Sequence, residues 1–120
     1  MNVSNFDLSP LEVDVSTTVA AVGNPDVQII DCREQNEWDA AHADGMILMP
    51  LDTIGQRMEE LDRQRPVIVV CRSGRRSLEA AEQLVAAGFT DAKSMNGGLI
   101  AWSELGHPLI ANEQETPQGN

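Results

Sequence analysis

Hydrophobic positions along this 120-residue chain follow two spacings. Short apolar or alternating runs are typical of strands, whereas apolar residues three and four positions apart are typical of helices. The strand pattern occurs at residues 11–15, 27–31, 46–49, 67–70 and 92–95. The helix pattern occurs at residues 17–22, 34–41, 51–62, 76–87 and 97–105. Because strands and helices alternate, the sequence predicts an α/β fold in which a mainly parallel sheet has helices on both faces.

Cap residues and composition shifts indicate where the elements and the domain begin and end. Ser16 is the expected N-cap of the first helix, and Gly88 is the expected stop of the fourth helix. No repeat or internal linker interrupts the pattern. We therefore predict one domain over residues 11–110, with a loose N-terminal arm at 1–10 and a polar C-terminal tail at 111–120.

Composition narrows the classes of partner and compartment. The formal net charge of −11 disfavours nucleic acid and membrane surfaces as partners. The N-terminus lacks the basic and apolar regions of a signal peptide, and no apolar run approaches the roughly 20 residues that span a bilayer. The two cysteines, Cys32 and Cys71, lack the spacing of a structural zinc site. We expect a reducing cytoplasm as the location.

The junction after the fourth strand is the most informative chemical feature of the chain. The apolar run at 66–70 stops at Cys71, and a short arginine-rich loop follows before the next helix. The loop residues are Arg72, Ser73, Gly74, Arg75, Arg76 and Ser77. Loop N–H groups, the helix N-terminus and the guanidinium groups all favour a thiolate over a thiol. The pattern therefore predicts a nucleophilic cysteine that handles a small anion.

Three separated motifs, taken in order, resemble those of a known family. They are Asp31-Cys32-Arg33-Glu34 with Glu37, Trp38, His42 and Gly45; Cys71 through Ser77; and Gly97-Gly98 with Trp102, Gly106 and Pro108. Together they resemble the rhodanese family of sulfurtransferases over about residues 11–110. The resemblance implies a rhodanese-like α/β fold with about five strands in a mainly parallel sheet.

The resemblance also implies a two-step sulfur transfer. The Cys71 thiolate attacks the outer sulfur of an anionic donor such as thiosulfate or a persulfide, and a cysteine persulfide remains. A thiol, including a protein thiol, or cyanide then accepts the sulfur. Arg72 and Arg76 are expected to hold the donor oxyanion, since arginine offers paired donors, whereas Arg75 is expected to face solvent or a partner. No metal or organic cofactor is expected.

Loop length separates sulfur transfer from phosphatase chemistry. Phosphatase-like sites place arginine six positions after the cysteine, where this chain has Ser77, and Arg76 comes one residue earlier. No aspartate in or beside the loop is a candidate general acid. Phosphatase activity is therefore only the second choice among enzymes.

Residues near the first motif have structural interpretations beside the chemical ones. Asp31 and Arg33 are predicted to form a supporting ion pair, and Glu37 is a second candidate partner of Arg33. His42 is interpreted as a turn histidine. Trp38 and Trp102 are expected in the core, and Gly97-Gly98 is expected to allow close backbone packing at a helix start. For Cys32, core packing is favoured over a role as resolving thiol for Cys71.

Two alternatives to the enzyme come from other functional classes. A rhodanese-like domain that binds or regulates without turnover is one, although the intact cysteine and arginine-rich loop disfavour it. A redox switch formed by Cys32 and Cys71 is the other. The sequence leaves open the physiological donor, the acceptor and the oligomeric state.

Overall fold

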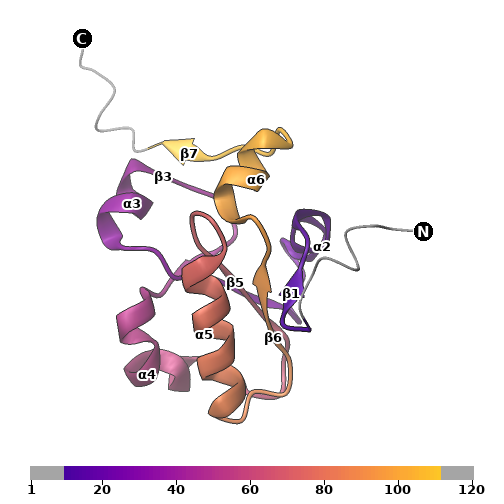
Figure 1. Ribbon diagram of the computed structural model, residues 1–120, viewed down its shortest axis with the longest axis vertical. Coiled ribbons are helices and arrows are strands. Elements are labelled where there is room, and N and C mark those ends of the chain that lie inside the picture. The colour runs from indigo at the N-terminus through magenta and orange to yellow at the C-terminus, as the bar shows by residue number, and fades with distance from the viewer. Residues whose placement is uncertain (1–9, 112–120) are drawn as a thin grey trace.

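The computed structural model describes residues 10–111 and contains a five-stranded, all-parallel sheet (Figure 1). Its strand order is β1-β6-β5-β2-β4. The strands are β1 (Glu12–Val13), β2 (Gln28–Asp31), β4 (Ile47–Leu48), β5 (Val67–Val70) and β6 (Ala92–Met95). Each strand falls within one of the five predicted stretches, so the predicted α/β class and parallel sheet are confirmed.

A second, two-stranded sheet lies outside the prediction. β3 (Ala41–His42) pairs antiparallel with β7 (Ile110–Ala111). Ala111, the first residue of the predicted polar tail, is the last residue of β7. Pro10, predicted as part of the arm, lies in a turn. The rest of the predicted arm and tail falls outside the described residues.

The helices largely follow the predicted pattern. They are α2 (Val15–Ala21), α3 (Gln35–Ala40), α4 (Ile54–Arg57), α5 (Arg75–Ala86) and α6 (Gly98–Glu104). The predicted cap of the first helix is wrong: Asp14 is the N-cap, and its carboxylate accepts a 2.8 Å hydrogen bond from the Thr17 N–H. Ser16 lies within the helix. Asp and Ser are both strong N-cap residues, so residue type alone does not tell which of Asp14 and Ser16 caps the helix.

The segment predicted as one helix over 51–62 is divided. It comprises a 3₁₀ turn η1 (Leu51–Thr53), the short α4 and a 3₁₀ turn η2 (Met58–Glu60). A 3₁₀ turn has three residues per turn, so residues three apart remain on one face. Ile54, Met58 and Leu61 therefore still reach the core despite the division.

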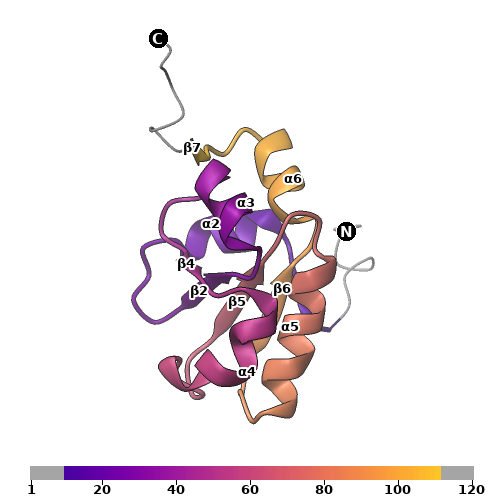
Figure 2. The same cartoon turned by 90° about the vertical axis from the view of Figure 1, so that its left-hand side faces the viewer.

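Side chains of the central strand β5 alternate between two hydrophobic layers. Val67 and Val69 pack into a layer with Leu84 of α5, whereas Ile68 and Val70 pack into a layer with α2 and α6. Figures 1 and 2 place α4 beside α5 on the first layer. Since β5 is buried on both faces, its carboxyl end is rigidly positioned between helices. Across residues 10–111, every helix is too short or too polar to cross a bilayer.

Candidate active site at the end of strand β5

The thiol of Cys71 lies at the carboxyl end of β5, inside a tight turn that leads into α5. The residue itself has no exposed surface. Gly74 is the N-cap of α5 and has a φ of +99°, a backbone conformation that favours glycine. This geometry lets the chain reverse direction within a few residues, so that the first turn of α5 faces the sulfur.

Three polar groups from the loop and the first turn of α5 surround the sulfur. The N–H groups of Gly74 and Ser77 lie 3.1 Å and 3.3 Å from the Cys71 Sγ atom, and the Ser77 hydroxyl oxygen lies 3.3 Å from it. The Ser77 hydroxyl also lies 2.6 Å from the hydroxyl of Ser94 in β6. When the sulfur is a thiolate it accepts from Ser77, and Ser94 can donate to the Ser77 oxygen in turn. The network therefore suits an anionic sulfur.

The second cysteine contributes most to the charge state of the first. The neighbouring Cys32 thiol, as a proton donor toward the Cys71 sulfur, is the largest cause of a Cys71 pKa well below its ordinary value of 9.0. The donors of Ser77 and Gly74 lower that pKa further, whereas burial opposes them. The same interaction and burial raise the pKa of Cys32. These opposite shifts favour the thiolate on Cys71 and the thiol on Cys32.

The outer side of the loop is held by the start of α6. The N–H groups of Leu99 and Ile100 donate to the carbonyl oxygens of Cys71 and Arg72, at 2.9 Å and 3.0 Å. Gly98, with a φ of +60°, allows this approach, because a Cβ atom there would lie 2.3 Å from the Arg72 carbonyl oxygen. The expected close packing at Gly97-Gly98 is thus confirmed.

The carboxylate of Glu37 pairs with Arg76, and this differs from the predicted pairing with Arg33. Two bonds of 2.7 Å and 3.0 Å join the Arg76 guanidinium to the Glu37 carboxylate. The pairing lowers the pKa of Glu37 to about 2. It also joins α3 to the first turn of α5. Sequence spacing alone could not distinguish the two arginines, because Glu37 and Arg76 are 39 residues apart.

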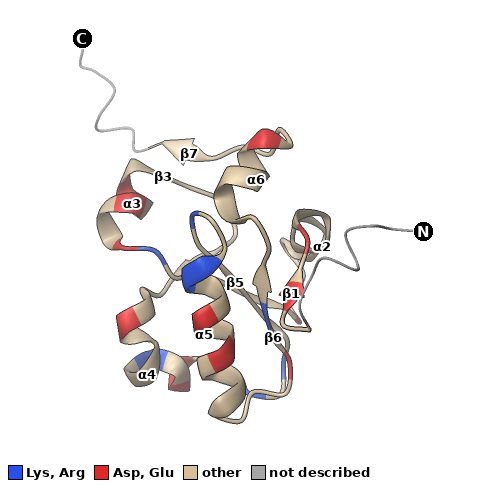
Figure 3. Ribbon diagram, viewed as in Figure 1, with Lys and Arg blue, Asp and Glu red and all other residues tan. Residues whose placement is uncertain are grey.

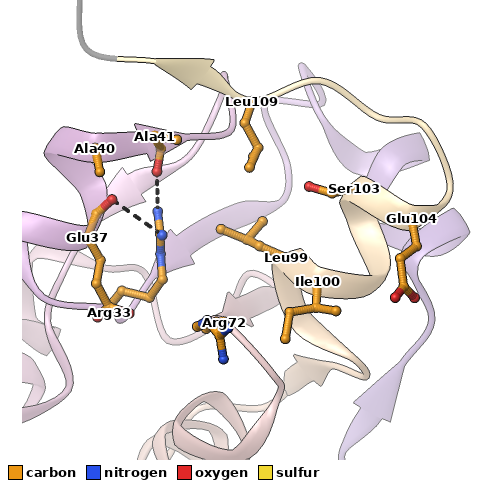
Figure 4. A pocket seen from close by; sticks show the side chains of 10 residues that line it. All are labelled: Arg33, Glu37, Ala40, Ala41, Arg72, Leu99, Ile100, Ser103, Glu104 and Leu109. Atoms are coloured by element: carbon orange, nitrogen blue, oxygen red, sulfur yellow. Dashed lines mark hydrogen bonds between the residues drawn. The ribbon is translucent and has the colours of Figure 1, made fainter. Parts of the chain in front are cut away.

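The predicted ion pair of Asp31 and Arg33 is present and buried. The Arg33 Nη2 atom lies 2.9 Å from Asp31 Oδ2. Arg33 also donates to the carbonyl oxygens of Ala41 and Glu37, as Figure 4 shows. These bonds tie the end of β2 to α3 and β3.

The remaining loop arginines are exposed, and they differ in position. Figure 3 shows positive charge at the loop and the start of α5, with acidic residues on the surrounding helices. Arg75 is exposed on α5. Arg72 lines a cleft of about 520 Å³ between α3 and α6 (Figure 4). Leu99, Ile100 and Leu109 supply apolar lining to this cleft.

Other predicted residues have structural positions. His42 stacks on Trp38 with ring centroids 4.0 Å apart, and its Nδ1 atom lies 3.0 Å from the Trp38 carbonyl oxygen. Trp102 is buried in the core, and Trp38 is partly buried against it. Within residues 10–111, no cluster of three His, Cys, Asp or Glu side chains could hold a metal ion.

Ser94 is the site residue that sequence reasoning missed. It is fully buried in β6 between Lys93 and Met95. Its hydroxyl also reaches the Gly74 carbonyl oxygen at 3.4 Å. A polar residue within a predicted strand was the available signal, but only the folded position of α5 against β6 shows that this hydroxyl meets Ser77.

Comparisons with known proteins identify a matching family and similar sequences. The profile of the rhodanese-like domain matches residues 15–105. The probable adenylyltransferase/sulfurtransferase MoeZ of Mycobacterium tuberculosis is 38% identical over 82 residues, which make up 67% of this chain and 21% of that protein. This chain therefore spans about a fifth of the length of that relative. The thiosulfate sulfurtransferase GlpE of Pseudoalteromonas translucida is 36% identical over 90 residues, 75% of this chain and 86% of that protein.

A solved structure extends the likeness to the fold. The solution structure of the rhodanese-like domain of the Anabaena protein Alr3790 matches with a TM-score of 0.77 at 26% identity, covering 93% of this chain and 88% of that one. Both of these relatives are named as sulfurtransferases. Because the profile covers most of the chain, these findings show that this protein belongs to the rhodanese-like domain family.

Proposed function

We propose that this protein is a sulfurtransferase that moves sulfane sulfur from thiosulfate or a persulfide donor to a thiol or cyanide acceptor through a Cys71 persulfide. The observation that carries the proposal is the set of donors aimed at the buried Cys71 sulfur. Such donors stabilise a thiolate before the reaction and a persulfide anion after it. The named sulfurtransferase relatives give independent support.

In the first step, the Cys71 thiolate attacks the outer sulfur of thiosulfate. A sulfur–sulfur bond forms to Cys71, the bond to the sulfonate sulfur breaks, and sulfite leaves with the electron pair of that bond. In the second step, an acceptor thiolate or cyanide attacks the outer sulfur and restores the Cys71 thiolate. Each step conserves charge, and neither needs a cofactor.

The surroundings of Cys71 favour a single transferred sulfur atom. The residue is fully buried, so that only a small group can reach it within the loop. Arg72 lies where the cleft meets this loop, and we assign it the oxyanion of the donor. Arg76 keeps part of its donor capacity when paired with Glu37, and it is the second candidate for that oxyanion. Arg75 faces solvent or contacts a protein acceptor.

We extend the proposal to the organisation and location of the chain. Residues 11–110 form the functional domain, and the arm and tail have no part in the chemistry. A reducing cytoplasm suits a site that depends on a free thiolate. Acceptors are small thiols, cyanide or protein thiols, and the negative charge of the chain argues against nucleic acid and membrane partners.

The test is the mass of the intact chain after incubation with thiosulfate without reducing agent. Wild type is expected to gain one sulfur atom, and Cys71→Ser is expected to gain none. Circular dichroism of Cys71→Ser controls for folding. Added cyanide should then remove the sulfur and yield thiocyanate. A folded wild-type chain that gains no sulfur from thiosulfate or from a small persulfide contradicts the proposal.

A further inference from the structure

The two cysteines lie side by side at the ends of neighbouring strands. Asp31 of β2 is in register with Val70 of β5, so the next residues of the two strands, Cys32 and Cys71, are adjacent. The Cys32 N–H donates to the Val70 carbonyl oxygen at 2.8 Å, which continues the pairing to this point. Both cysteines are fully buried in the same hydrophobic layer.

This placement is compatible with a disulfide. Neighbouring parallel strands lie about 4.8 Å apart, inside the range of roughly 4.4–6.8 Å between the Cα atoms of bridged cysteines. The two side chains also lie on the same side of the sheet, because both belong to the buried layer that contains Val67 and Val69. The donors from Gly74 and Ser77 come from the loop and α5, whereas Cys32 comes from the sheet.

We propose that Cys32 is a resolving thiol that converts an unused Cys71 persulfide into a Cys32–Cys71 disulfide with release of hydrosulfide. This inference rests on the proposed function, because the persulfide is its starting point. The Cys32 sulfur attacks the inner sulfur of the persulfide, the bond between the inner and outer sulfur atoms breaks, and the outer sulfur leaves with the electron pair. The Cys32 proton goes to the departing sulfur.

The step balances without an added oxidant. The transferred sulfur is reduced to hydrosulfide by two electrons, and the two cysteine sulfurs are oxidised to the disulfide. The loop N–H groups that stabilise the persulfide anion can also stabilise the departing hydrosulfide. Because burial and the neighbouring charge keep Cys32 protonated, the step is slower than transfer to an abundant acceptor. It therefore acts on persulfide that finds no acceptor, and it leaves the protein with a Cys32–Cys71 disulfide.

The experiment follows persulfide-loaded protein in the absence of oxygen and acceptor. Wild type, Cys32→Ser and Cys32→Val are loaded with thiosulfate and freed of donor, and intact mass and free sulfide are measured over time. Wild type is expected to lose the added sulfur, release one sulfide per chain and end two hydrogen masses below the reduced chain. Both variants are expected to keep the sulfur, with at least a tenfold longer persulfide lifetime. Serine is the closer control, because it can still donate a hydrogen bond to Cys71.

The outcomes of this experiment distinguish failure of the resolving role from failure of the proposed function. Equal persulfide lifetimes in wild type and the folded variants, with no disulfide, overturn the resolving role. If thiosulfate loads none of the chains, its assignment as donor fails, and inorganic polysulfide supplies the persulfide for the same comparison. A chain that takes sulfur from neither reagent overturns both this inference and the proposed function.

Discussion

Substitution of Gly98 by alanine tests whether the start of α6 holds the active-site loop in place. The added Cβ atom would lie 2.3 Å from the Arg72 carbonyl oxygen and 2.6 Å from that of Cys71. An ordinary contact begins at 3.4 Å, so that relief requires a displacement of about 1 Å. The backbone bonds from Leu99 and Ile100 to the same two carbonyl groups resist that displacement.

Two costs add in this variant. Alanine at a positive φ costs about 1–2 kcal/mol. Forcing extra volume into a packed contact costs about 1–3 kcal/mol more. We therefore expect Gly98→Ala to lower the free energy of unfolding by about 2–5 kcal/mol. A displacement of about 1 Å at a reacting group can reduce a rate about a hundredfold, and persulfide formation should slow accordingly.

The chain offers a matched control at Gly23. This residue also has a positive φ, of +84°, but a Cβ atom there would meet nothing within 4 Å. Gly23→Ala should therefore lose only the conformational cost of about 1–2 kcal/mol. Its persulfide formation should equal that of wild type, because Gly23 lies in a turn after α2, outside the residues that surround Cys71.

Urea unfolding gives the stability of each variant, and intact mass after timed exposure to thiosulfate gives the rate of persulfide formation. The comparison is made at a temperature where both variants are folded. Equal losses of stability in the two variants, with an unchanged rate in Gly98→Ala, would refute the argument that this glycine permits the contact between α6 and the loop.

Three further predictions concern charge and capping. Ser77→Ala removes a charge-assisted hydrogen bond worth about 1.5–3 kcal/mol, so the Cys71 pKa should rise by about 1–2 units, measured as an upward shift in the pH profile of iodoacetamide alkylation. Glu37→Gln should cost about 1 kcal/mol in urea unfolding at neutral pH. Because the folded pKa of Glu37 lies below its ordinary value of 4.5, this difference should be constant above pH 4.5 and shrink as pH falls toward 2; a difference that persists at pH 2 would contradict the ion-pair explanation. Asp14→Ala should cost about 1 kcal/mol through loss of the α2 cap, whereas Ser16→Ala should cost less than half of that; equal costs would contradict the assignment of the cap.

Much of the fold could be predicted because local pattern and burial agree. The run at β5 is apolar at four consecutive positions, and the structure buries all four. The pairing of β3 with β7 could not be predicted in this way. Each of those strands has two residues, their partners are far apart in the chain, and neither has an alternating pattern. Their pairing depends on the packing of α3 and α6, because β3 follows α3 and β7 follows α6 in the chain.

Some parts of the site could be predicted from local sequence, whereas others depend on contacts between distant residues. Cys71 and its loop form a continuous stretch, so their chemistry was visible in the sequence. The partner of Glu37 and the neighbour of Cys71 depend on strand order, which periodicity does not determine. Once β2 lies next to β5, Cys32 meets Cys71, and α3 brings Glu37 to Arg76.

The central position of β5 explains how a fully buried cysteine can be anionic. Burial alone would raise the pKa of Cys71, so the surrounding donors must more than offset the loss of solvent. These groups come from three directions. Cys32 directly follows the neighbouring strand β2, Gly74 and Ser77 lie at the start of α5, and Ser94 acts through Ser77 from the neighbouring strand β6. A strand at the edge of the sheet has a neighbour on only one side, and it could not receive both contributions. The order β6-β5-β2 therefore creates the chemical environment of the thiolate as well as its position.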